Sequence, residues 1–257
     1  MIKVNFIGRL GNNMIQYSIA KFISDIKKQK LCYSITGNTN CDLMFNIFPK
    51  TQIQNNESFT NNNTKIFGYD STDNQIQNFN MQDLLDHDGD ILLNGFFQKK
   101  EFLFDNFNII KNYFQYDFQS LKDSSQYDVV IHLRLGDYIQ LNHFIHPDKI
   151  YNLYKNLGFS NALILSDDPN HFFLSKFKSD HTCTIQNNSA IQDLHYMITS
   201  KNIIISQSTF SWWGSYLGNL KNIYVPYDDN QYLWPYEPKN DDIDLIPNKK
   251  NYHKIKL

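Results

Sequence analysis

The stretch Asn202-Ile203-Ile204-Ile205-Ser206-Gln207-Ser208-Thr209-Phe210-Ser211-Trp212-Trp213-Gly214 runs from an apolar segment into hydroxyl residues and then into aromatic ones. The apolar segment predicts a buried strand over 202–206, and the residues 209–219 predict a helix. Hydroxyl side chains and unpaired backbone N–H groups at a helix start are suited to bind a phosphate or a sugar. We therefore expect Ser208 and Thr209 to bind a phosphate. A capping sequence followed by core aromatics is the alternative.

Strand and helix patterns alternate along the rest of the chain, which predicts an α/β fold with parallel sheets covered on both faces. The polar stretch 120–126 is expected to link an N-terminal domain over 1–122 to a C-terminal domain over 123–257. Residues 50–80 are expected to form irregular loops with short strands. The tail after Pro226 is expected to be irregular, and packing of the tail on the N-terminal domain is left open. The predicted strands are 2–7, 91–97, 127–135, 161–166, 202–206 and 222–226, and the predicted helices are 14–28, 102–118, 147–157, 189–200 and 209–219.

The predicted strand 127–135 carries a second group of candidate site residues. Period-two alternation places His132 and Arg134 on one face and the apolar residues of odd number in the core. Ligands bind at the carboxyl ends of parallel strands, and a guanidinium offers two parallel donors that match a diphosphate. We expect Arg134 to bind phosphate and Asp137 to orient it. A surface ion pair between these two residues explains the pattern about equally well.

Two further turns follow predicted strands. Asp167 and Asp168 follow the strand 161–166, where a carboxylate can accept hydrogen bonds from guanine, although an ordinary turn before proline explains them better when they are taken alone. Gly8-Arg9-Leu10-Gly11-Asn12 lacks the third glycine of a dinucleotide fingerprint. If it forms the first turn from strand to helix, Arg9 and Asn12 face the ligand cleft.

Composition limits the classes of function. With 41% hydrophobic residues in 257 the chain can bury one large core or two small ones, and a net charge of -2 gives no sign of a nucleic-acid partner. Three cysteines without a pairing motif favour a reducing compartment. No stretch approaches the roughly 20 apolar residues of a membrane span. We expect a cytoplasmic protein, and peripheral contact with the inner face of a membrane is left open.

Four blocks of this sequence resemble glycosyltransferase family 11, the α-1,2-fucosyltransferases. Gly8–Tyr17 is similar to that family's G-x-L-G-N-Q-M-F-Q-Y, and Asn94–Gln98 is similar to its G-Y-F-Q. His132–Tyr138 is similar to H-x-R-R-G-D-Y, and Ser206–Gly214 is similar to N-S-T-F-S-W-W-G. The resemblance departs from the pattern at Leu135, at Gln207 and at Arg9, although arginine occurs at the last of these positions in the related protein O-fucosyltransferases.

The resemblance implies a GT-B-like architecture of two Rossmann-like domains with a donor cleft between them. It implies inverting, metal-independent transfer of L-fucose from GDP-β-L-fucose to the 2-hydroxyl of a terminal β-galactoside, in surface glycan or O-antigen synthesis, with no cofactor. From residue chemistry and resemblance together, the expected catalytic residues are Arg134, Asn12, Asp137 and His132, and the expected donor-binding residues are Arg9, Arg134, Asp167, Asp168, Ser208, Thr209 and Phe210.

Three alternatives remain open at this point. A glycosyltransferase of the same fold can use another GDP-sugar or form another linkage. Asp88 and Asp90 form a D-x-D triplet of the kind that holds a metal on a nucleotide diphosphate, although a turn at Gly89 explains it better. A non-catalytic protein can bind carbohydrate by stacking the tryptophans at 212, 213 and 234 on sugar rings. We expect the first two tryptophans to pack the helix instead.

Overall fold

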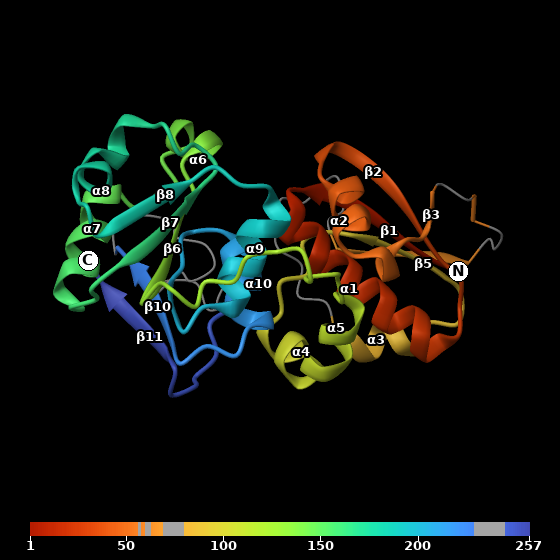
Figure 1. Cartoon of the computed structure of the whole chain (residues 1–257). Coiled ribbons are helices and arrows are strands. Elements are labelled where there is room, and N and C mark those ends of the chain that lie inside the picture. Colours follow the sequence, from red (N-terminus) through yellow and green to blue (C-terminus); the bar gives the residue numbers. More distant parts are fainter. Residues whose placement is uncertain (56–57, 60–62, 69–79, 229–244) are drawn as a thin grey trace. The chain divides into compact units, whose positions relative to one another are not determined.

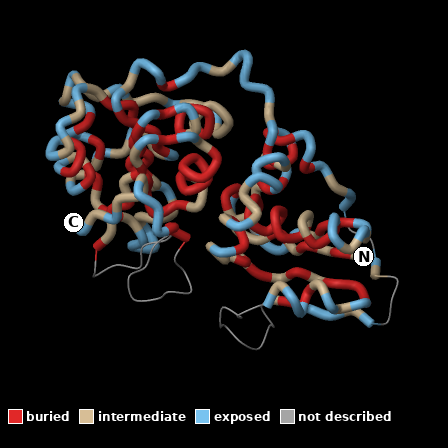
Figure 2. The backbone as a smooth tube through the Cα atoms, turned by 90° about the horizontal axis from the view of Figure 1, so that it is seen from below, coloured by how far each residue is buried: buried red, intermediate tan, exposed pale blue. Residues whose placement is uncertain are grey.

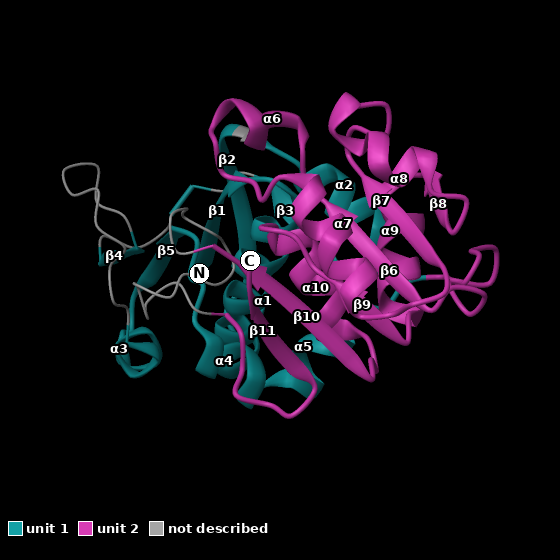
Figure 3. Cartoon of the chain, turned by 90° about the vertical axis from the view of Figure 1, so that its left-hand side faces the viewer, with its two compact units in different colours: residues 1–116 teal, residues 117–257 magenta. Residues whose placement is uncertain are grey.

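A computed structural model describes residues 1–55, 58–59, 63–68, 80–228 and 245–257, which form two compact units over 1–116 and 117–257 (Figure 3). The division falls six residues before the position expected at 122/123. The intervening residues are bonded to the second unit, because the Lys122 nitrogen donates to Gln192 Oε1 at 3.2 Å and the Ser124 nitrogen donates to Thr199 Oγ1 at 3.2 Å.

Unit 1 contains a five-stranded parallel sheet in the order β3-β2-β1-β5-β4. The chain moves outward from β1 to β3 and then continues on the other side of β1, where β5 lies between β1 and the edge strand β4. The strands are β1 Ile2–Gly8, β2 Leu31–Thr39, β3 Gln54–Asn55, β4 Thr64–Gly68 and β5 Asp90–Asn94; the helices are α1 Leu10–Lys27, α2 Cys41–Ile47, η1 Pro49–Thr51, α3 Met81–Asp86, α4 Lys100–Asp105 and α5 Phe107–Tyr113 (Figure 1).

Unit 2 contains a six-stranded parallel sheet in the order β11-β10-β9-β6-β7-β8, and here the order reverses between β6 and β9. Helices α7 and α8 lie on one face of this sheet, and α9 and α10 lie on the other (Figure 1). The strands are β6 Val129–Leu133, β7 Ala162–Ser166, β8 Cys183–Gln186, β9 Asn202–Ile204, β10 Asn222–Tyr227 and β11 Tyr252–Lys256; the helices are α6 Gly136–Gln140, α7 Pro147–Asn156, η2 Phe172–Leu174, α8 Ser175–Ser179, α9 Ala190–Thr199 and α10 Thr209–Leu217.

The core of unit 2 confirms the alternation predicted for β6. Val129, Ile131, Leu133 and Leu135 all lie in one buried cluster with residues of α7 and α8. Buried residues form the inner surfaces of the sheet and helices, as Figure 2 shows. Trp212 and Trp213 are fully buried, which confirms that they pack α10.

Several predicted elements are wrong in extent. The first helix begins at Leu10 and not at Met14, so Gly11 and Asn12 lie in its first turn. The helix predicted over 102–118 is two short helices that meet at Asn106, whose side chain donates to the Phe102 carbonyl at 2.9 Å. The tail is not irregular throughout, because residues 252–256 form β11 in parallel register with β10. Within the described residues, no helix is both long and apolar enough to cross a bilayer.

Candidate functional site

The carboxyl ends of β6, β7 and β9 lie side by side in unit 2, at the point where the strand order reverses. In open parallel sheets such a reversal leaves a crevice between two crossovers that lead to opposite faces, and ligands bind there. Arg134 follows β6, Asp167 and Asp168 follow β7, and Ser206–Ser208 precede α10 after β9. The topology therefore brings together the predicted site residues of this unit.

Arg134 is held by two carboxylates at this edge. Its Nη2 donates to Asp137 Oδ1 at 2.5 Å and its Nη1 contacts Asp167 Oδ2 at 2.9 Å, while the ring of Tyr138 lies 5.3 Å from the guanidinium carbon. Asp167 is itself fixed, because its Oδ1 accepts a hydrogen bond from the Leu135 nitrogen at 2.8 Å. The Arg134 side chain is 21% exposed, so it is oriented by its protein partners and is still partly accessible to solvent. The ion pair with Asp137 is present, and Asp167 is a second partner that the sequence did not indicate.

Gly136 provides the room for this arrangement. A Cβ atom at Gly136 would lie 2.4 Å from Asp167 Oδ2, the oxygen that contacts Arg134. Real Cβ contacts are not found at such distances, so a side chain here must displace the carboxylate.

We expect Gly136→Ala to lower the free energy of unfolding by about 1–3 kcal/mol, because the added methyl group overpacks a fixed carboxylate. Chemical denaturation of the wild type and the variant measures this change. The matched control is the double variant Gly136→Ala/Asp167→Ala, in which the clash is absent. Its loss should be smaller than the sum of the two single losses. Additive losses would show that the two residues do not interact.

His132 lies on the same face of β6 as Arg134 but is buried, with 4% exposure. Its Nδ1 lies 2.7 Å from Ser206 Oγ, and the ring of Phe210 packs edge-on against it. Ser206 is tied in turn to Ser211, because its backbone nitrogen donates to Ser211 Oγ at 3.3 Å. His132 thus connects β6 to the loop that begins α10. Burial, together with the charge of Arg134, lowers the pKa of His132 to about 3.

The lowered pKa of His132 has a measurable consequence. The unfolded chain binds a proton at this residue below about pH 6.5, whereas the folded chain does so only near pH 3, so stability falls as the pH falls through this window. The slope is about 1.4 kcal/mol per pH unit at most. We expect the free energy of unfolding to fall less steeply from pH 6.5 to 4.5 in His132→Gln than in the wild type. Substitution of the exposed His181 by glutamine is the control; equal slopes in all three proteins would contradict the expectation.

The first turn of α10 is built around Ser208. The Ser208 hydroxyl accepts a hydrogen bond from the Phe210 nitrogen at 3.2 Å and so caps the helix. The Thr209 hydroxyl has no hydrogen-bond partner among the described residues, and both Thr209 and Phe210 are partly exposed. The capping alternative is therefore correct for Ser208. A capping hydroxyl still has its own proton to donate, so capping and phosphate binding are compatible.

Gln207, which stands where the resembled family has asparagine, is buried and spans two segments. Its Oε1 accepts a hydrogen bond from the Ile145 nitrogen at 3.2 Å, and its Nε2 donates to the Pro226 carbonyl at 3.4 Å. Through these two hydrogen bonds the Gln207 side chain connects the loop before α10 to β10 and to the segment at Ile145.

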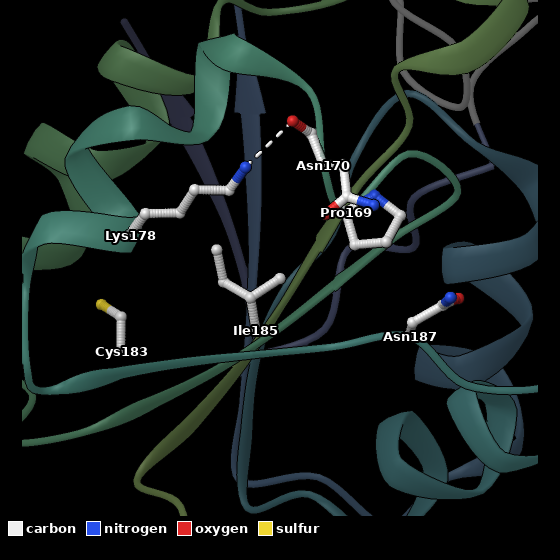
Figure 4. Close-up of a pocket in the computed structure, with 6 residues that line it drawn as sticks. All are labelled: Pro169, Asn170, Lys178, Cys183, Ile185 and Asn187. Carbon is white, nitrogen blue, oxygen red and sulfur yellow. Dashed lines mark hydrogen bonds between the residues drawn. The ribbon is translucent and has the colours of Figure 1, made fainter.

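The two aspartates after β7 differ in their surroundings. Asp167 is committed to Arg134 and to the Leu135 nitrogen, whereas the carboxylate of Asp168 has no partner among the described residues. Sequence alone did not separate these roles. Beside Asp168, a hollow of about 320 Å³ lies along β8, with the ammonium of Lys178 bonded to the Asn170 carbonyl at one side (Figure 4). Its lining residues are Pro169, Asn170, Lys178, Cys183, Ile185 and Asn187.

Unit 1 holds the remaining predicted site residues at the carboxyl edge of its own sheet. Arg9 is exposed and directly precedes α1, and Asn12 lies in the first turn of that helix. Gln98, four residues beyond β5, donates from Nε2 to Asn12 Oδ1 at 3.2 Å. Gln98 belongs to the G-Y-F-Q-like block but was not predicted as a site residue.

The D-x-D triplet lies at the opposite, amino edge of that sheet. Asp90 begins β5, is 1% exposed and bonds the Met1 nitrogen at 2.5 Å. Within the residues that the structure describes, no group of three or more histidine, cysteine, aspartate or glutamate side chains is placed to hold a metal ion.

His146 caps α7, since its Nδ1 accepts a hydrogen bond from the Asp148 nitrogen. Trp234 lies outside the described residues.

The comparison with known protein families points to the same edge of unit 2. Residues 159–246 match the family model of glycosyl transferase family 11. The matched segment runs from β7 past β10 and includes Asp167, Asp168 and Ser208–Phe210. No curated protein gives a significant match to the sequence.

Among solved structures, the NodZ α-1,6-fucosyltransferase soaked with GDP-fucose matches with a TM-score of 0.50 and 11% identity, over 86% of this chain and 93% of that chain. A NodZ structure is described as coming from Bradyrhizobium. TibC, a bacterial iron-containing dodecameric glycosyltransferase from enterotoxigenic E. coli H10407, matches with a TM-score of 0.50 and 12% identity, over 92% of this chain and 61% of that chain. POFUT1 in complex with GDP matches with a TM-score of 0.48 and 13% identity, over 85% and 95% of the two chains. At these identities the likeness to NodZ and TibC establishes the fold, which is α/β, parallel and GT-B-like.

Proposed function

We propose that this protein transfers L-fucose from GDP-β-L-fucose to a hydroxyl group of a carbohydrate acceptor. The observation that carries the proposal is Arg134, fixed by Asp137 and Asp167 beside the start of α10 at the strand-order reversal. A guanidinium group offers two parallel N–H donors, and a helix N-terminus offers free backbone N–H groups. Together they suit a diphosphate leaving group. The family 11 match over 159–246 and the NodZ structure, described as soaked with GDP-fucose, support the identity of the donor.

In this proposal the reaction is a single displacement. The acceptor hydroxyl oxygen forms a bond to the anomeric carbon while the bond from that carbon to the β-phosphate oxygen breaks, so the configuration inverts. The acceptor hydroxyl loses its proton and GDP departs with the bonding electron pair. Arg134, the hydroxyls of Ser208 and Thr209 and the N–H groups of the first α10 turn stabilise the negative charge that grows on the phosphate. In this scheme neither a metal nor a cofactor takes part.

The surroundings of each side chain suggest distinct roles within the proposed donor-binding site. Asp167 and Asp137 orient Arg134, and Asp168, which has no protein partner among the described residues, is free to accept hydrogen bonds from the guanine ring. His132 is a positioning residue in this proposal, since a buried imidazole with a pKa of about 3 is a weak base at neutral pH. We place the Phe210 ring and Arg9 against the donor, and Asn12 beside the reacting atoms as an orienting group.

The finer assignment follows the sequence resemblance. We propose that the acceptor ends in β-galactose, that the new linkage is α-1,2, and that the enzyme acts in the cytoplasm or at the inner face of a membrane. A non-catalytic carbohydrate-binding protein would need exposed tryptophans to stack on sugar rings. Trp212 and Trp213 are fully buried and are not available for such stacking.

Incubation with GDP-fucose and a panel of β-galactosides tests the proposal, with the linkage read by NMR. We expect a 2-O-fucosylated product whose formation is not reduced by EDTA. Tight binding of GDP separates an enzyme of this class from a lectin, which has no use for a nucleotide. Absence of both GDP binding and fucosyl transfer would refute the proposed donor; loss of activity with EDTA would favour a metal-dependent enzyme.

A further inference from the structure

Two turns lie side by side at the carboxyl ends of the neighbouring strands β1 and β5 of unit 1, and each contributes one amide side chain. Asn12 comes from the first turn of α1 after β1, and Gln98 comes from the turn after β5. Gln98 Nε2 donates to Asn12 Oδ1 at 3.2 Å, and Asn12 Nδ2 has no hydrogen-bond partner among the described residues. The Asn12 amide therefore has its acceptor oxygen occupied and its two donor hydrogens available.

The backbone makes room for this pair. A Cβ atom at Gly8 would lie 2.6 Å from Asn12 Nδ2 and 3.3 Å from the Phe96 ring, so the bare glycine lets both side chains lie against β1. Phe97 has a φ of 53°, in the left-handed region that a bulky aromatic residue rarely adopts. Strained backbone of this kind persists where surrounding structure enforces it, and it is concentrated at functional sites. Here the strained residue directly precedes Gln98.

Buried amides lock the two turns together beneath the pair. Gln16 Nε2 donates to the Gly95 carbonyl at 3.0 Å, and its Oε1 accepts a hydrogen bond from the Ile7 nitrogen at 3.3 Å. Asn13 adds a hydrogen bond from its Nδ2 to the Ile7 carbonyl at 3.1 Å. Because both turns are fixed to the same buried side chains, the spacing between Asn12 and Gln98 is set by the fold. A site that must present one polar group in one orientation needs such support.

We propose that Gln98 is a positioning residue that holds the Asn12 side-chain oxygen, so that unit 1 presents the Asn12 NH₂ group, beside Gly8, as a hydrogen-bond donor to an oxygen of the sugar acceptor. This inference rests on the proposed fucosyl transfer. Sugar hydroxyl and ring oxygens accept hydrogen bonds, and a neutral amide donates to them without introducing charge. A side-chain amide offers a donor on one end and an acceptor on the other, so its orientation decides which group the substrate meets.

The test is Gln98→Glu, assayed with GDP-fucose and lactose between pH 8 and pH 5. An ionised carboxylate only accepts hydrogen bonds, so the Asn12 amide must turn its NH₂ group toward residue 98 and present its oxygen to the acceptor instead. As the pH falls, the introduced carboxyl group takes up a proton and can donate as glutamine does. We expect transfer at pH 8 to be reduced on the order of tenfold or more relative to wild type. The ratio of variant to wild-type activity should begin to rise as the pH approaches 5, because a glutamate carboxyl has an ordinary pKa of about 4.3 and is then partly protonated.

Two control variants accompany this measurement. Gln98→Leu removes the hydrogen bond at every pH, so its loss of transfer should not depend on pH. Gln52→Glu introduces the same charge at an exposed position of unit 1 and should behave as wild type. GDP affinity should be unchanged in all three variants, because the residues assigned to the diphosphate lie in unit 2.

The side-chain amide signals of Asn12 in ¹⁵N-edited NMR provide a readout that needs no activity. In Gln98→Glu at pH 8, one amide proton should shift downfield relative to wild type, and the shift should disappear on acidification. A variant that matches wild type at pH 8 and fails at pH 5 would overturn the inference, as would a ratio to wild type that is flat with pH. If the wild type neither binds GDP nor uses GDP-fucose, the proposed function fails, and the NMR result still decides the orientation of Asn12.

Discussion

Replacing Arg134 with alanine is expected to lower the rate of fucosyl transfer by a factor on the order of 10²–10³. The guanidinium is fixed before any ligand arrives, because Asp137 and Asp167 hold its two terminal nitrogens. A preorganised cation stabilises the departing phosphate without reorganisation in the transition state. Steady-state kinetics with GDP-fucose should show the loss mainly in kcat, whereas KM for the acceptor should change little. Retention of turnover by the Arg134→Ala variant would refute the assignment.

The charges around Arg134 suggest a matched control. Two carboxylates face one guanidinium, so an incoming diphosphate must displace one of them or compete with both. Asp137 is the more exposed, at 38% against 25% for Asp167, and Asp167 is also fixed by the Leu135 nitrogen. We therefore expect the diphosphate to displace the Asp137 carboxylate from Arg134 rather than that of Asp167. Asp137→Asn keeps the cation and removes one competing charge, so it should bind GDP at least as tightly as wild type, whereas Arg134→Lys keeps the charge but loses the fork and should lie between wild type and Arg134→Ala.

The interior of unit 2 could be predicted well from the sequence. Strands β6, β7 and β9 are buried and mostly apolar because helices cover both faces of the sheet, and helix α9 begins at a serine that caps it. Once these elements alternate, the rule that ligands bind at carboxyl ends places Arg134 and Ser208 at one edge. The prediction that Leu135 faces the core followed from the same alternation and is confirmed.

Edge strands and side-chain partners could not be predicted in the same way. Strands β8 and β11 are only partly buried, so neither has the continuous apolar run that identifies a central strand. Asp167 and Asp168 are adjacent and chemically identical, and only the position of Arg134 distinguishes them. Gln98 meets Asn12 across 86 residues of sequence, a contact that no local pattern records.

Replacing Trp212 with alanine is expected to lower the free energy of unfolding by about 3–5 kcal/mol. The indole is fully buried, its ring stacks on Tyr216 at 4.8 Å, and its Nε1 donates to the Leu245 carbonyl at 3.0 Å. The substitution removes apolar contacts, opens a cavity and leaves that carbonyl without its partner. Because α10 begins at the Ser208 cap, its loosening should also weaken GDP binding. Urea denaturation measures the stability change.

Trp212→Phe is the conservative comparison, since it keeps an aromatic ring and loses the Nε1 hydrogen bond. Its destabilisation should be smaller, about 1–3 kcal/mol, and the folded variant should retain GDP binding. Trp213, equally buried, should behave like Trp212 on replacement by alanine. If Trp212→Ala instead kept its stability and lost only sugar binding, the tryptophans would be a sugar platform. The hydroxyls at the start of α10 would then not be the main ligand contacts of this loop.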